Sequence, residues 1–440
     1  MIDWEETTLG DVAEILSAKR VFARDYVDNG VPFWRGKEVV ELSAGRDVST
    51  ELFISEETYQ NLGKKAGFPS AGDILLTSVG TLGRVYRLTP KDRIYFKDGN
   101  LTWFRNFSER ICPQWLLYWL RSSAGQRALD SSKIGSTQQA LTIVNLKKIP
   151  FLCPPKVEQE KIAATLSSID DKIELNRRMN KTLEEMARAL FRDWFVDFGP
   201  TRRQMEGATD PTAIMGQAFR PEKAATLAPL FPAKLGEDGL PVGWETRTLN
   251  TVVEQQRQSV KPNQHLDEMF EHFSLPAFDK AKWPTSEHGA EIKSNKTAVP
   301  PNSLLVSKLN PRIERVWVPQ VAGEQRQICS TEFLCFRPAA GLGIATVEAL
   351  FRSDEMREKM EAMVTGTSNS HQRVPPKVLT QTDVLLPKIC TKAFEEVALP
   401  LLDKRQANEQ ENQTLAEMRD LLLPKLMSGE IRLKDAEAAV

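Results

Sequence analysis

The residues WEETTL at Trp4–Leu9 return as WETRTL at Trp244–Leu249, 240 positions further along the chain. A second match follows, because DILLTS at Asp73–Ser78 corresponds to NSLLVS at Asn302–Ser307, and each is followed by an Arg-Val pair. Self-similarity at a long and nearly constant spacing indicates that one structural unit occurs twice. We therefore expect a chain that contains two copies of one fold.

Two later matches keep the same order along the chain. LRS at Leu120–Ser122 corresponds to FRS at Phe351–Ser353, and TLEEM at Thr182–Met186 corresponds to TLAEM at Thr414–Met418. Since the matches are collinear, each copy spans about 230 residues.

Length and composition agree with a folded protein of several domains. The 440 residues exceed the roughly 250–300 at which one hydrophobic core stops growing. The five cysteines form no CxxC pair, so neither a zinc site nor a disulfide framework is indicated. The first residues lack a basic and apolar leader, and no apolar run approaches about 18 residues. We expect a cytoplasmic protein without membrane contact.

Net charge neither supports nor excludes a nucleic-acid partner. The chain has 58 Lys and Arg against 59 Asp and Glu, a net charge of −1. Domains that bind nucleic acid are usually basic. Local clusters of Lys and Arg matter more than the total, however, and a partner subunit could supply phosphate contacts.

The first part of each copy predicts a mixed α and β structure. Short runs of β-branched and aromatic residues, bounded by Gly, Pro and Asn, predict strands within 73–88, 93–104, 303–321 and 327–336. One amphipathic helix is predicted in each copy, near 113–129 and 345–363.

The last part of each copy has the pattern of a long helix. Apolar residues recur at alternating steps of three and four, a seven-residue repeat typical of helices that pack on one another. Four asparagines lie in these stripes, where a buried Asn would cost stability and fix the register. The predicted seam consists of Ile162, Leu166, Ile169, Ile173, Asn176, Asn180, Leu183, Leu190, Phe394, Leu401, Asn408, Asn412, Leu415 and Leu422.

Two equivalent helices most economically pack on each other, so we expect an antiparallel coiled coil. The alternative is that each helix packs only on its own domain and that the asparagines are ordinary solvated residues. Arg405 and Arg419 also fall in the second stripe, which makes that seam imperfect.

Motifs for catalysis are not found in the sequence. A P-loop is absent, and Gly341-Leu342-Gly343 lacks the third glycine of a dinucleotide loop and predicts a turn. Asn310-Pro311-Arg312 lacks the second proline and the aromatic residue of the adenine methyltransferase motif. The four histidines all lie in the second copy, so no metal or acid–base cluster is duplicated. We expect neither metal nor cofactor on this chain.

Several segments resemble the specificity subunits of type I restriction-modification enzymes. IPFLCPP at Ile149–Pro155 is similar to the exit from a target-recognition domain, and LFRDWFVDF at Leu190–Phe198 resembles the end of the first central helix. LPVGW at Leu240–Trp244 resembles the start of the second domain, and LLLPKLMSGEI at Leu421–Ile431 resembles the C-terminal signature. The resemblance covers essentially the whole chain.

This resemblance implies a non-catalytic recognition subunit that binds double-stranded DNA at a two-part, asymmetric site. It implies partners as well: two methyltransferase subunits docked on the helices, and restriction subunits outside them. S-adenosylmethionine, ATP and Mg would then be bound by the partner subunits. The exit of the second copy, Val384–Cys390, departs from the pattern because it lacks the second proline and the Glu-Gln pair. The alternative function is a two-module scaffold for protein binding.

The repeat, the helical stripes and the composition between the copies also suggest domain boundaries. Forty helical residues span roughly 60 Å, somewhat over one turn of DNA at about 34–36 Å. The predicted parts are a first target-recognition domain at 1–155, a first spacer helix at 156–198, a linker rich in Pro, Gly and Ala at 199–243, a second target-recognition domain at 244–388, and a second spacer helix with the C-terminal tail at 389–440.

Candidate DNA contacts are polar and basic residues at expected loops. Gln and Asn pair with adenine and Arg with guanine, whereas Lys and Ser mainly contact phosphate. Any one of them could instead be a solvated loop residue. The candidates are Lys19, Arg20, Arg24, Arg35, Lys64, Lys65, Ser78, Thr81, Arg84, Ser136, Thr137, Gln138, Gln139, Gln256, Arg257, Lys308, Asn310, Arg312, Ser368, Asn369, His371, Gln372 and Arg373.

Overall fold

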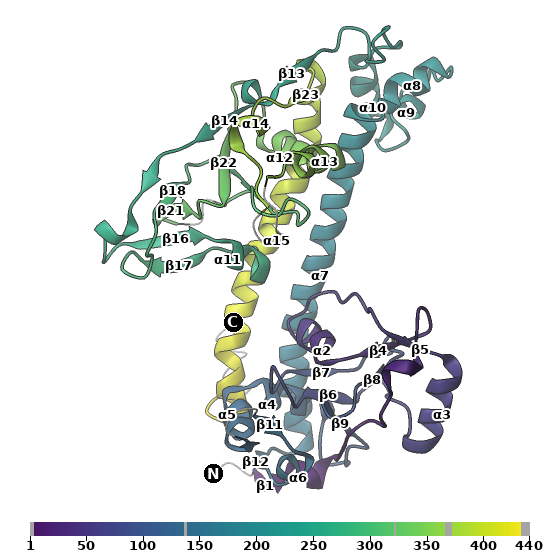
Figure 1. The fold of residues 1–440 in the computed structure, drawn as a ribbon, viewed down its shortest axis with the longest axis vertical. Helices are drawn as coiled ribbons and strands as arrows, with labels where there is room; N and C mark the ends of the chain where they lie inside the picture. The colour runs from purple at the N-terminus through teal and green to yellow at the C-terminus, as the bar shows by residue number, and fades with distance from the viewer. Residues whose placement is uncertain (1–3, 136–138, 321–322, 366–371, 433–440) are drawn as a thin grey trace. The chain divides into compact units, whose positions relative to one another are not determined.

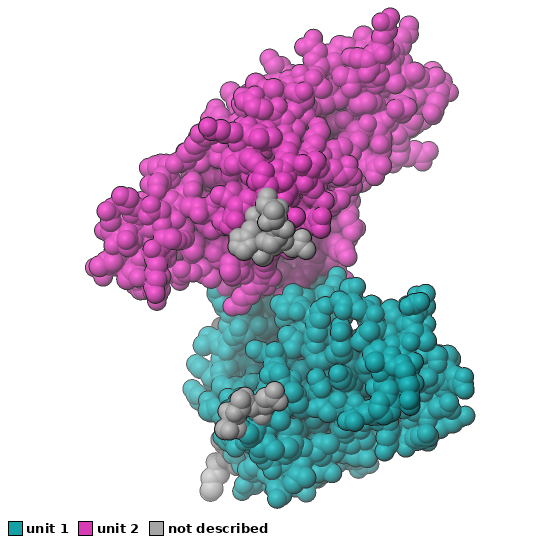
Figure 2. Space-filling model, viewed as in Figure 1, with its two compact units in different colours: residues 1–174, 414–440 teal, residues 175–413 magenta. Residues whose placement is uncertain are grey.

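The computed structural model describes residues 4–135, 139–320, 323–365 and 372–432. They divide into two compact units, which are coloured separately in Figure 2. Unit 1 comprises residues 1–174 and 414–440, and unit 2 comprises residues 175–413. Each unit therefore contains part of both long helices, α7 (Lys156–Phe195) and α15 (Lys388–Ser428).

The strands of unit 1 form two four-stranded sheets and two short pairs. Their bounds are β1 Glu5–Thr8, β2 Glu14–Leu16, β3 Tyr26–Val27, β4 Val31–Trp34, β5 Phe53–Ile54, β6 Ile74–Thr77, β7 Val85–Arg87, β8 Tyr95–Phe96, β9 Leu101–Arg105, β10 Lys133–Ile134, β11 Ala140–Leu141 and β12 Pro150–Cys153. One sheet has the antiparallel order β2-β9-β6-β7 (Figure 1). The other has the order β3-β5-β4-β8, with β4 and β8 parallel. The pairs are β1-β12 and β10-β11.

The helices of unit 1 before α7 are short. They are α1 Leu9–Val12, α2 Gly36–Ser43, α3 Glu56–Ala66, α4 Pro113–Arg121, α5 Ser123–Ser131 and α6 Ile143–Lys147. Trp115 and Leu116 of α4 are fully buried in one core with Ile74 and Leu76 of β6. This helix therefore covers a face of the sheet that contains β6.

The prediction of one continuous helix near 113–129 is wrong, because Ser122 separates α4 from α5. The backbone of Ser122 is extended (φ −67°, ψ 161°), and its hydroxyl accepts a hydrogen bond from the Gly125 amide at 3.2 Å. Serine favours such N-cap positions because its side chain replaces the missing helical partner of an amide. Ser353 repeats this break in the second copy, with the Met356 amide as donor at 3.2 Å.

The strands of unit 2 form a four-stranded sheet, a five-stranded sheet and one pair. Their bounds are β13 Thr246–Thr248, β14 Val253–Gln256, β15 Ser259–Val260, β16 Met269–Phe273, β17 Thr285–His288, β18 Lys296–Ala298, β19 Leu304–Ser307, β20 Val316–Trp317, β21 Arg326–Cys329, β22 Phe333–Pro338 and β23 Asp383–Leu385. The antiparallel order β14-β22-β19-β20 repeats that of β2-β9-β6-β7. The larger sheet has the order β15-β18-β21-β16-β17, and β13 pairs with β23.

The helices of unit 2 also follow the order of unit 1. α12 Ile344–Arg352, α13 Asp354–Ala362 and α14 Pro376–Leu379 correspond to α4, α5 and α6, and α11 is Leu275–Ala281. The same sheet, helix pair and closing strand pair thus occur twice, which agrees with the repeated sequence. A mixed helix and sheet fold, the coarse part of the predicted class, is confirmed.

The segment predicted as a linker is folded over much of its length. It contains α8 Gly199–Met205, α9 Pro211–Ile214 and α10 Pro221–Leu227. Met215 and Phe231 are buried in one core with Trp194 of α7, and the rings of Trp194 and Phe231 lie 5.0 Å apart. Burial of these scattered apolar side chains does not need a regular spacing, so the absence of periodicity was a poor guide to folding here.

The two long helices contact each other within each unit. In unit 1, Ile162 and Leu166 of α7 share a core with Leu426 and Met427 of α15. In unit 2, the rings of Trp194 and Phe394 lie 5.7 Å apart. Both ends of the pair are therefore apolar.

Asparagines connect the two helices within unit 2. Asn408 Nδ2 donates to Asn180 Oδ1 at 2.8 Å, and Asn176 Nδ2 donates to Asn412 Oδ1 at 3.0 Å. Residue numbers fall along α15 as they rise along α7, so these segments run antiparallel. Of the predicted seam residues, the buried ones are Ile162, Leu166, Ile169, Ile173, Asn176, Phe394 and Asn408, and the half-buried ones are Asn180, Leu183, Leu190, Leu401, Asn412, Leu415 and Leu422.

In unit 2 a buried charge cluster joins α12 to the long helices. Arg352 contacts Glu314 at 2.6 Å, Glu348 at 3.0 Å and Glu184 at 3.2 Å, and Arg405 contacts Glu348 at 2.7 Å. Burial alone would raise the pKa of Glu348, but the two arginines hold the pKa of this carboxyl below its usual value. Arg405 falls in the predicted apolar stripe of α15. Its charge is paired by Glu348 of α12, which lies outside that stripe.

In unit 1 the corresponding joint has fewer carboxylates. Asp170 of α7 accepts hydrogen bonds from Tyr118 at 2.8 Å and from Arg419 at 2.9 Å. Burial, with a smaller effect of Asp170, raises the pKa of Tyr118 to about 12, so the phenol keeps its proton and remains a donor. Arg121 lies 3.8 Å from the same carboxylate.

Within the part of the chain that the structure describes, no helix is long and apolar enough to cross a bilayer.

Candidate DNA-recognition edges

In unit 1, three loops meet at one end of the sheet β2-β9-β6-β7. Strand β2 ends at Leu16 and β6 ends at Thr77, while β9, antiparallel to both, begins at Leu101. The Ser78 amide donates to the Asn100 carbonyl at 2.8 Å, and the Gly99 amide donates to the Ser17 hydroxyl at 3.2 Å. The segments 17–20, 78–84 and 97–100 therefore lie together, and we call them edge 1.

A fourth segment reaches edge 1 from the region after α5. The Leu141 amide donates to the Ser78 carbonyl at 3.0 Å, and Ala140 forms an isolated bridge with Val79. Lys19, Arg20, Thr81, Arg84 and Gln139 are all exposed in these segments. Candidates that are up to 120 residues apart in the sequence, at Lys19 and Gln139, are thus brought to one place.

In unit 2, edge 2 is built in the same way at the end of the sheet β14-β22-β19-β20. It comprises segments 256–258, 308–313, 330–332 and 372–374, next to the ends of β14 and β19 and the start of β22. The Asn310 amide donates to the Gln372 carbonyl at 3.0 Å, and the Val374 amide donates to the Lys308 carbonyl at 2.9 Å.

The backbone of edge 2 presents its tip to solvent. Asn310 has a left-handed conformation (φ 51°), which Asn tolerates better than most residues, and its carbonyl accepts from the Ile313 amide at 2.9 Å. This turn leaves Arg312 exposed. The segment Asn310-Pro311-Arg312, which the sequence analysis compared with a methyltransferase motif, therefore lies in a surface turn.

Several arginines of the two edges reach solvent while they contact half-buried partners. Arg20 pairs with Asp98 at 2.8 Å, Arg373 pairs with Glu332 at 3.0 Å, and Arg257 donates to the Gln255 side chain at 2.8 Å. Hydrogen bonds to Glu332 raise the pKa of Arg373, which remains a cation. Exposed ion pairs contribute little to stability, so a phosphate or a base could replace these partners at small cost.

Two candidates have positions that do not suit contact with DNA. Ser78 is buried and its hydroxyl lies 2.6 Å from that of Thr102, so it stabilises the end of β6 instead of reaching a phosphate. Arg35 already pairs with the buried Glu38 at 2.9 Å and with Glu51 at 3.0 Å. Both residues are hydrophilic, which suggested a role at the surface. Their polar groups instead form hydrogen bonds and ion pairs with neighbouring residues of the same domain.

The remaining candidates lie apart from the edges or outside the described residues. Arg24, Lys64 and Lys65 are exposed, in η1 (Ala23–Asp25) and α3, and belong to none of the edge 1 segments. Ser136, Thr137, Gln138, Ser368, Asn369 and His371 fall outside the described residues.

Sequence reasoning missed one loop of each edge. Lys97, Asp98 and Asn100 lie in the turn between β8 and β9, and Glu332 lies in the matching turn before β22. The predicted strands 93–104 and 327–336 each ran through such a turn, so these residues were treated as strand interior. Dividing the runs at Gly99 and at Ser330 would have identified both loops.

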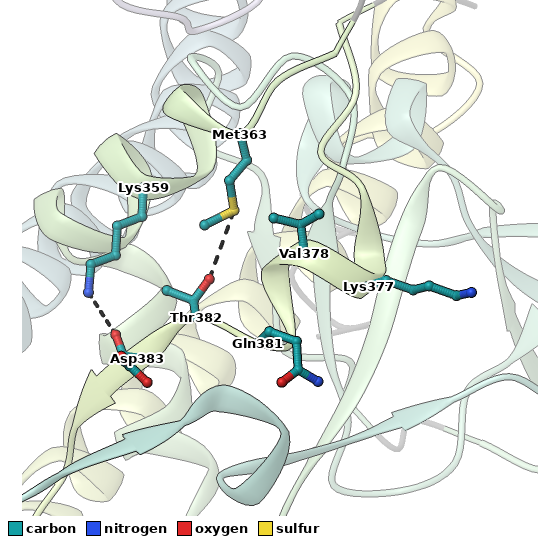
Figure 3. A pocket seen from close by; sticks show the side chains of 7 residues that line it. All are labelled: Lys359, Met363, Lys377, Val378, Gln381, Thr382 and Asp383. Carbon is teal, nitrogen blue, oxygen red and sulfur yellow. Dashed lines mark hydrogen bonds between the residues drawn. The ribbon is translucent and has the colours of Figure 1, made fainter.

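A shallow hollow on unit 2 lies between α13, α14 and β23. Figure 3 shows its lining residues, with Met363 and Val378 forming an apolar floor and Lys377 pointing outward. Lys359 Nζ donates to the Asp383 carbonyl at 2.7 Å. Its lining includes no histidine, cysteine or serine, and no nucleophile paired with a base. Among the described residues, no group of three or more His, Cys, Asp or Glu could hold a metal ion.

Comparisons with known proteins find similar sequences and folds. Residues 1–185 match the family model described as "Type I restriction modification DNA specificity domain". The type I restriction enzyme MjaIX specificity subunit of Methanocaldococcus jannaschii is 24% identical over 454 residues, covering 98% of this chain and 94% of that protein. The HindI specificity subunit of Haemophilus influenzae is 24% identical over 489 residues, covering 98% of this chain and all of that protein.

The first 185 residues thus match the type I specificity domain, and the chain is similar over nearly its whole length to type I specificity subunits. The resemblance found in the sequence is confirmed, and so is the expectation of a recognition subunit that is not itself an enzyme. The crystal structure of the type I S subunit from M. genitalium is similar in fold, with a TM-score of 0.54 and 16% identity over 97% of this chain and 96% of that chain.

Proposed function

We propose that this specificity subunit reads a two-part DNA sequence, one part with edge 1 and the other with edge 2. The observation that carries the proposal is that one backbone arrangement is built twice from different side chains. Edge 1 presents Lys19, Arg20 and Gln139, whereas edge 2 presents Arg312 and Gln372. Equivalent frames with different polar groups are suited to reading different bases.

The residue types of both edges favour DNA over a protein partner. The amides of Gln139 and Gln372 can pair with adenine in two hydrogen bonds, and Arg312 can pair with guanine. Lys19 and Lys308 are suited to phosphate contacts, which position a protein without reading sequence. Polar and charged side chains outnumber the exposed apolar ones, Val79 and Ile313, in the two edges.

We further propose that α7 and α15 act as an antiparallel coiled-coil spacer between the two recognition domains. The asparagine hydrogen bonds in unit 2 support this role, since a polar seam residue fixes the register of a helix pair. Helices of 40 and 41 residues would each span roughly 60 Å. A fixed register would then set the spacing between the two half-sites.

The partners in this proposal are two methyltransferase subunits on the helices and restriction subunits outside them. S-adenosylmethionine, ATP and Mg would be bound by those partners. The names of the relatives support this assignment, because each is the specificity subunit of a type I restriction enzyme.

The test is to change one edge and to measure which half of the target changes. The chain is combined with its methyltransferase partner, and methylated sites are mapped on random-sequence duplex DNA. Arg312→Ala should relax one half-site by about 1–3 kcal/mol of base discrimination and leave the other half intact. Lys64→Ala, exposed and away from the edge, is the matched control.

Methylation of an unchanged sequence after exchange of residues 1–155 for the equivalent domain of a relative would overturn the proposal. It would instead favour the scaffold function, in which the two modules bind proteins. Equal relaxation of both half-sites by Arg312→Ala would also contradict separate reading by the two edges.

A further inference from the structure

Arg121 and Arg352 occupy equivalent positions in the two copies. Each is the last residue of its helix, α4 or α12, within the repeated segments LRS and FRS. Each donates from Nη2 to an equivalent carbonyl, that of Val85 at 3.5 Å for Arg121 and that of Val316 at 2.9 Å for Arg352. The two guanidinium groups therefore have the same setting in the fold.

Their carboxylate partners differ completely. Arg352 has Glu348, Glu314 and Glu184 within 3.2 Å. By the repeat offsets of 231 and 232, the corresponding positions around Arg121 hold Leu117, Gly83 and Ala416. Unit 2 thus neutralises its arginine with three acidic residues whose equivalents unit 1 lacks.

The single carboxylate near Arg121 already has other partners. Asp170 accepts from Tyr118 and Arg419 at 2.8 and 2.9 Å but lies 3.8 Å from Arg121, beyond hydrogen-bonding distance. Burial lowers the pKa of Arg121, because desolvation of the cation is only partly offset by Asp170. Among the described residues, the Val85 carbonyl is the only acceptor for its guanidinium. Arg121 is half-buried, so its charge is less well paired than that of Arg352.

Arg121 lines a cavity of about 250 Å³ within unit 1, together with Arg84, Arg419, Tyr118, Asp170 and Asp420. Arg419 pairs with both aspartates, with Asp170 at 2.9 Å and with Asp420 at 2.8 Å. Arg84 has no ion-pair partner in the described part of the chain. Three arginines thus line the cavity with only two aspartates, and Arg121 has no closer carboxylate than Asp170 at 3.8 Å.

We propose that this cavity binds a phosphate group. Phosphate carries about 1.5–2 negative charges near neutral pH and several strong acceptor oxygens, so one group complements the excess of arginine over aspartate in the cavity. The volume lies below the roughly 300–1,000 Å³ of pockets for drug-sized ligands, which suits a phosphate with a few waters. The guanidinium fork of arginine fits the geometry of phosphate oxygens. The inference shares Arg84 with edge 1 but does not require that the edges read bases.

The test measures binding of inorganic phosphate to the full chain by calorimetry, in a phosphate-free buffer at constant ionic strength. Wild type should bind one phosphate, and Arg121→Gln should bind it at least about tenfold more weakly, because a charge-assisted pair is lost. Arg127→Gln, exposed on the neighbouring α5, should bind as wild type does.

A second variant adds a carboxylate next to Arg121 instead of removing the arginine. Ala416→Glu places a carboxylate where unit 2 has Glu184, so it should neutralise Arg121 and abolish phosphate binding while Arg121 remains. This variant decides the matter if Arg121→Gln does not fold. Absence of binding to wild type, or binding unchanged in the cavity variants, would overturn the proposal.

Competition identifies the source of the phosphate. If a short DNA duplex displaces inorganic phosphate, and Arg121→Gln weakens duplex binding, the site takes a phosphate of the DNA backbone. If phosphate and duplex bind together, the site takes a free phosphate or a small phosphate ester. Both results support the site, and binding that persists in Arg121→Gln contradicts it.

Discussion

The two units differ in the charges at the joint between the sheet domain and the long helices. In unit 2 the joint is a filled ionic cluster, in which Glu348 lies between Arg352 and Arg405. In unit 1 the joint contains a cavity, and Asp170 serves Tyr118 and Arg419. The two copies of a duplicated fold can therefore share the same backbone contacts and still differ in charge. In one copy, buried carboxylates pair the arginine. In the other copy, the arginine is available to a ligand.

The largest expected effect breaks the ionic joint of unit 2. Glu348→Gln leaves Arg352 and Arg405 buried without their shared carboxylate, and breaking a buried pair costs about 3–5 kcal/mol. Urea unfolding followed by hydrogen exchange of unit 2 peptides would measure this loss. Glu358→Gln, exposed on α13, should change stability very little. Equal stability of the two variants would show that the cluster does not hold the joint.

Acid should weaken the same joint. The pKa of Glu348 is lowered in the folded protein from an ordinary value of 4.5. A lowered pKa gives stability that is fully present above 4.5 and is lost as the pH falls through the folded value. Because protonation resembles Glu348→Gln, its effect cannot exceed that of the variant. The urea midpoint should fall on acidification, and it should fall less in Glu348→Gln than in wild type.

A smaller effect is expected at the polar middle of the helix pair. Asn180→Ala removes the acceptor of the buried Asn408 amide and the donor to the Arg405 carbonyl at 3.1 Å. Leaving such groups unpaired costs about 1–3 kcal/mol. Met179→Ala, exposed on the preceding position of α7, is the control in the same urea measurement. A larger loss for the control would show that these amides do not stabilise the pair.

The smallest effect on stability should come from an edge residue. Arg20 is largely exposed in its pair with Asp98, so Arg20→Gln should change the free energy of unfolding by less than about 1 kcal/mol. DNA binding should nevertheless weaken, with a salt dependence reduced by about one phosphate contact. Arg24→Gln, exposed but away from edge 1, should keep the wild-type salt dependence. If the DNA affinity of both variants depends on salt to the same extent, Arg20 does not contact DNA.

The repeated elements were predictable because they depend on local patterns. The apolar stripe from Ile162 to Ile173 predicted a helix face that is indeed buried. At Leu401 the strict seven-residue spacing was a poorer guide, because its neighbour Leu402 is the buried residue and the steps from Phe394 to Ala398 and Leu402 are both four. Small changes of helical phase cannot be deduced from spacing alone.

The candidate site was predicted in its residue types more than in its partners. Lys19, Arg84 and Gln139 were named as separate runs, and only the antiparallel order of β2, β9 and β6 brings them together. Ser78 shows the opposite case, since a polar residue at the end of a strand was assigned to the surface but is buried against Thr102. Exposure depends on long-range pairing, which a single sequence does not reveal.

The core of unit 1 includes Leu426 and Met427, which lie more than 250 residues after Leu166 in the same core. Because a ribosome releases the chain from its N-terminus, the first domain emerges long before these two residues do. Until Leu426 and Met427 have been synthesised, Ile162 and Leu166 remain incompletely covered. A chain that terminates shortly after residue 413 would therefore lack part of the core of its N-terminal domain. Chaperones and proteases would have access to that domain.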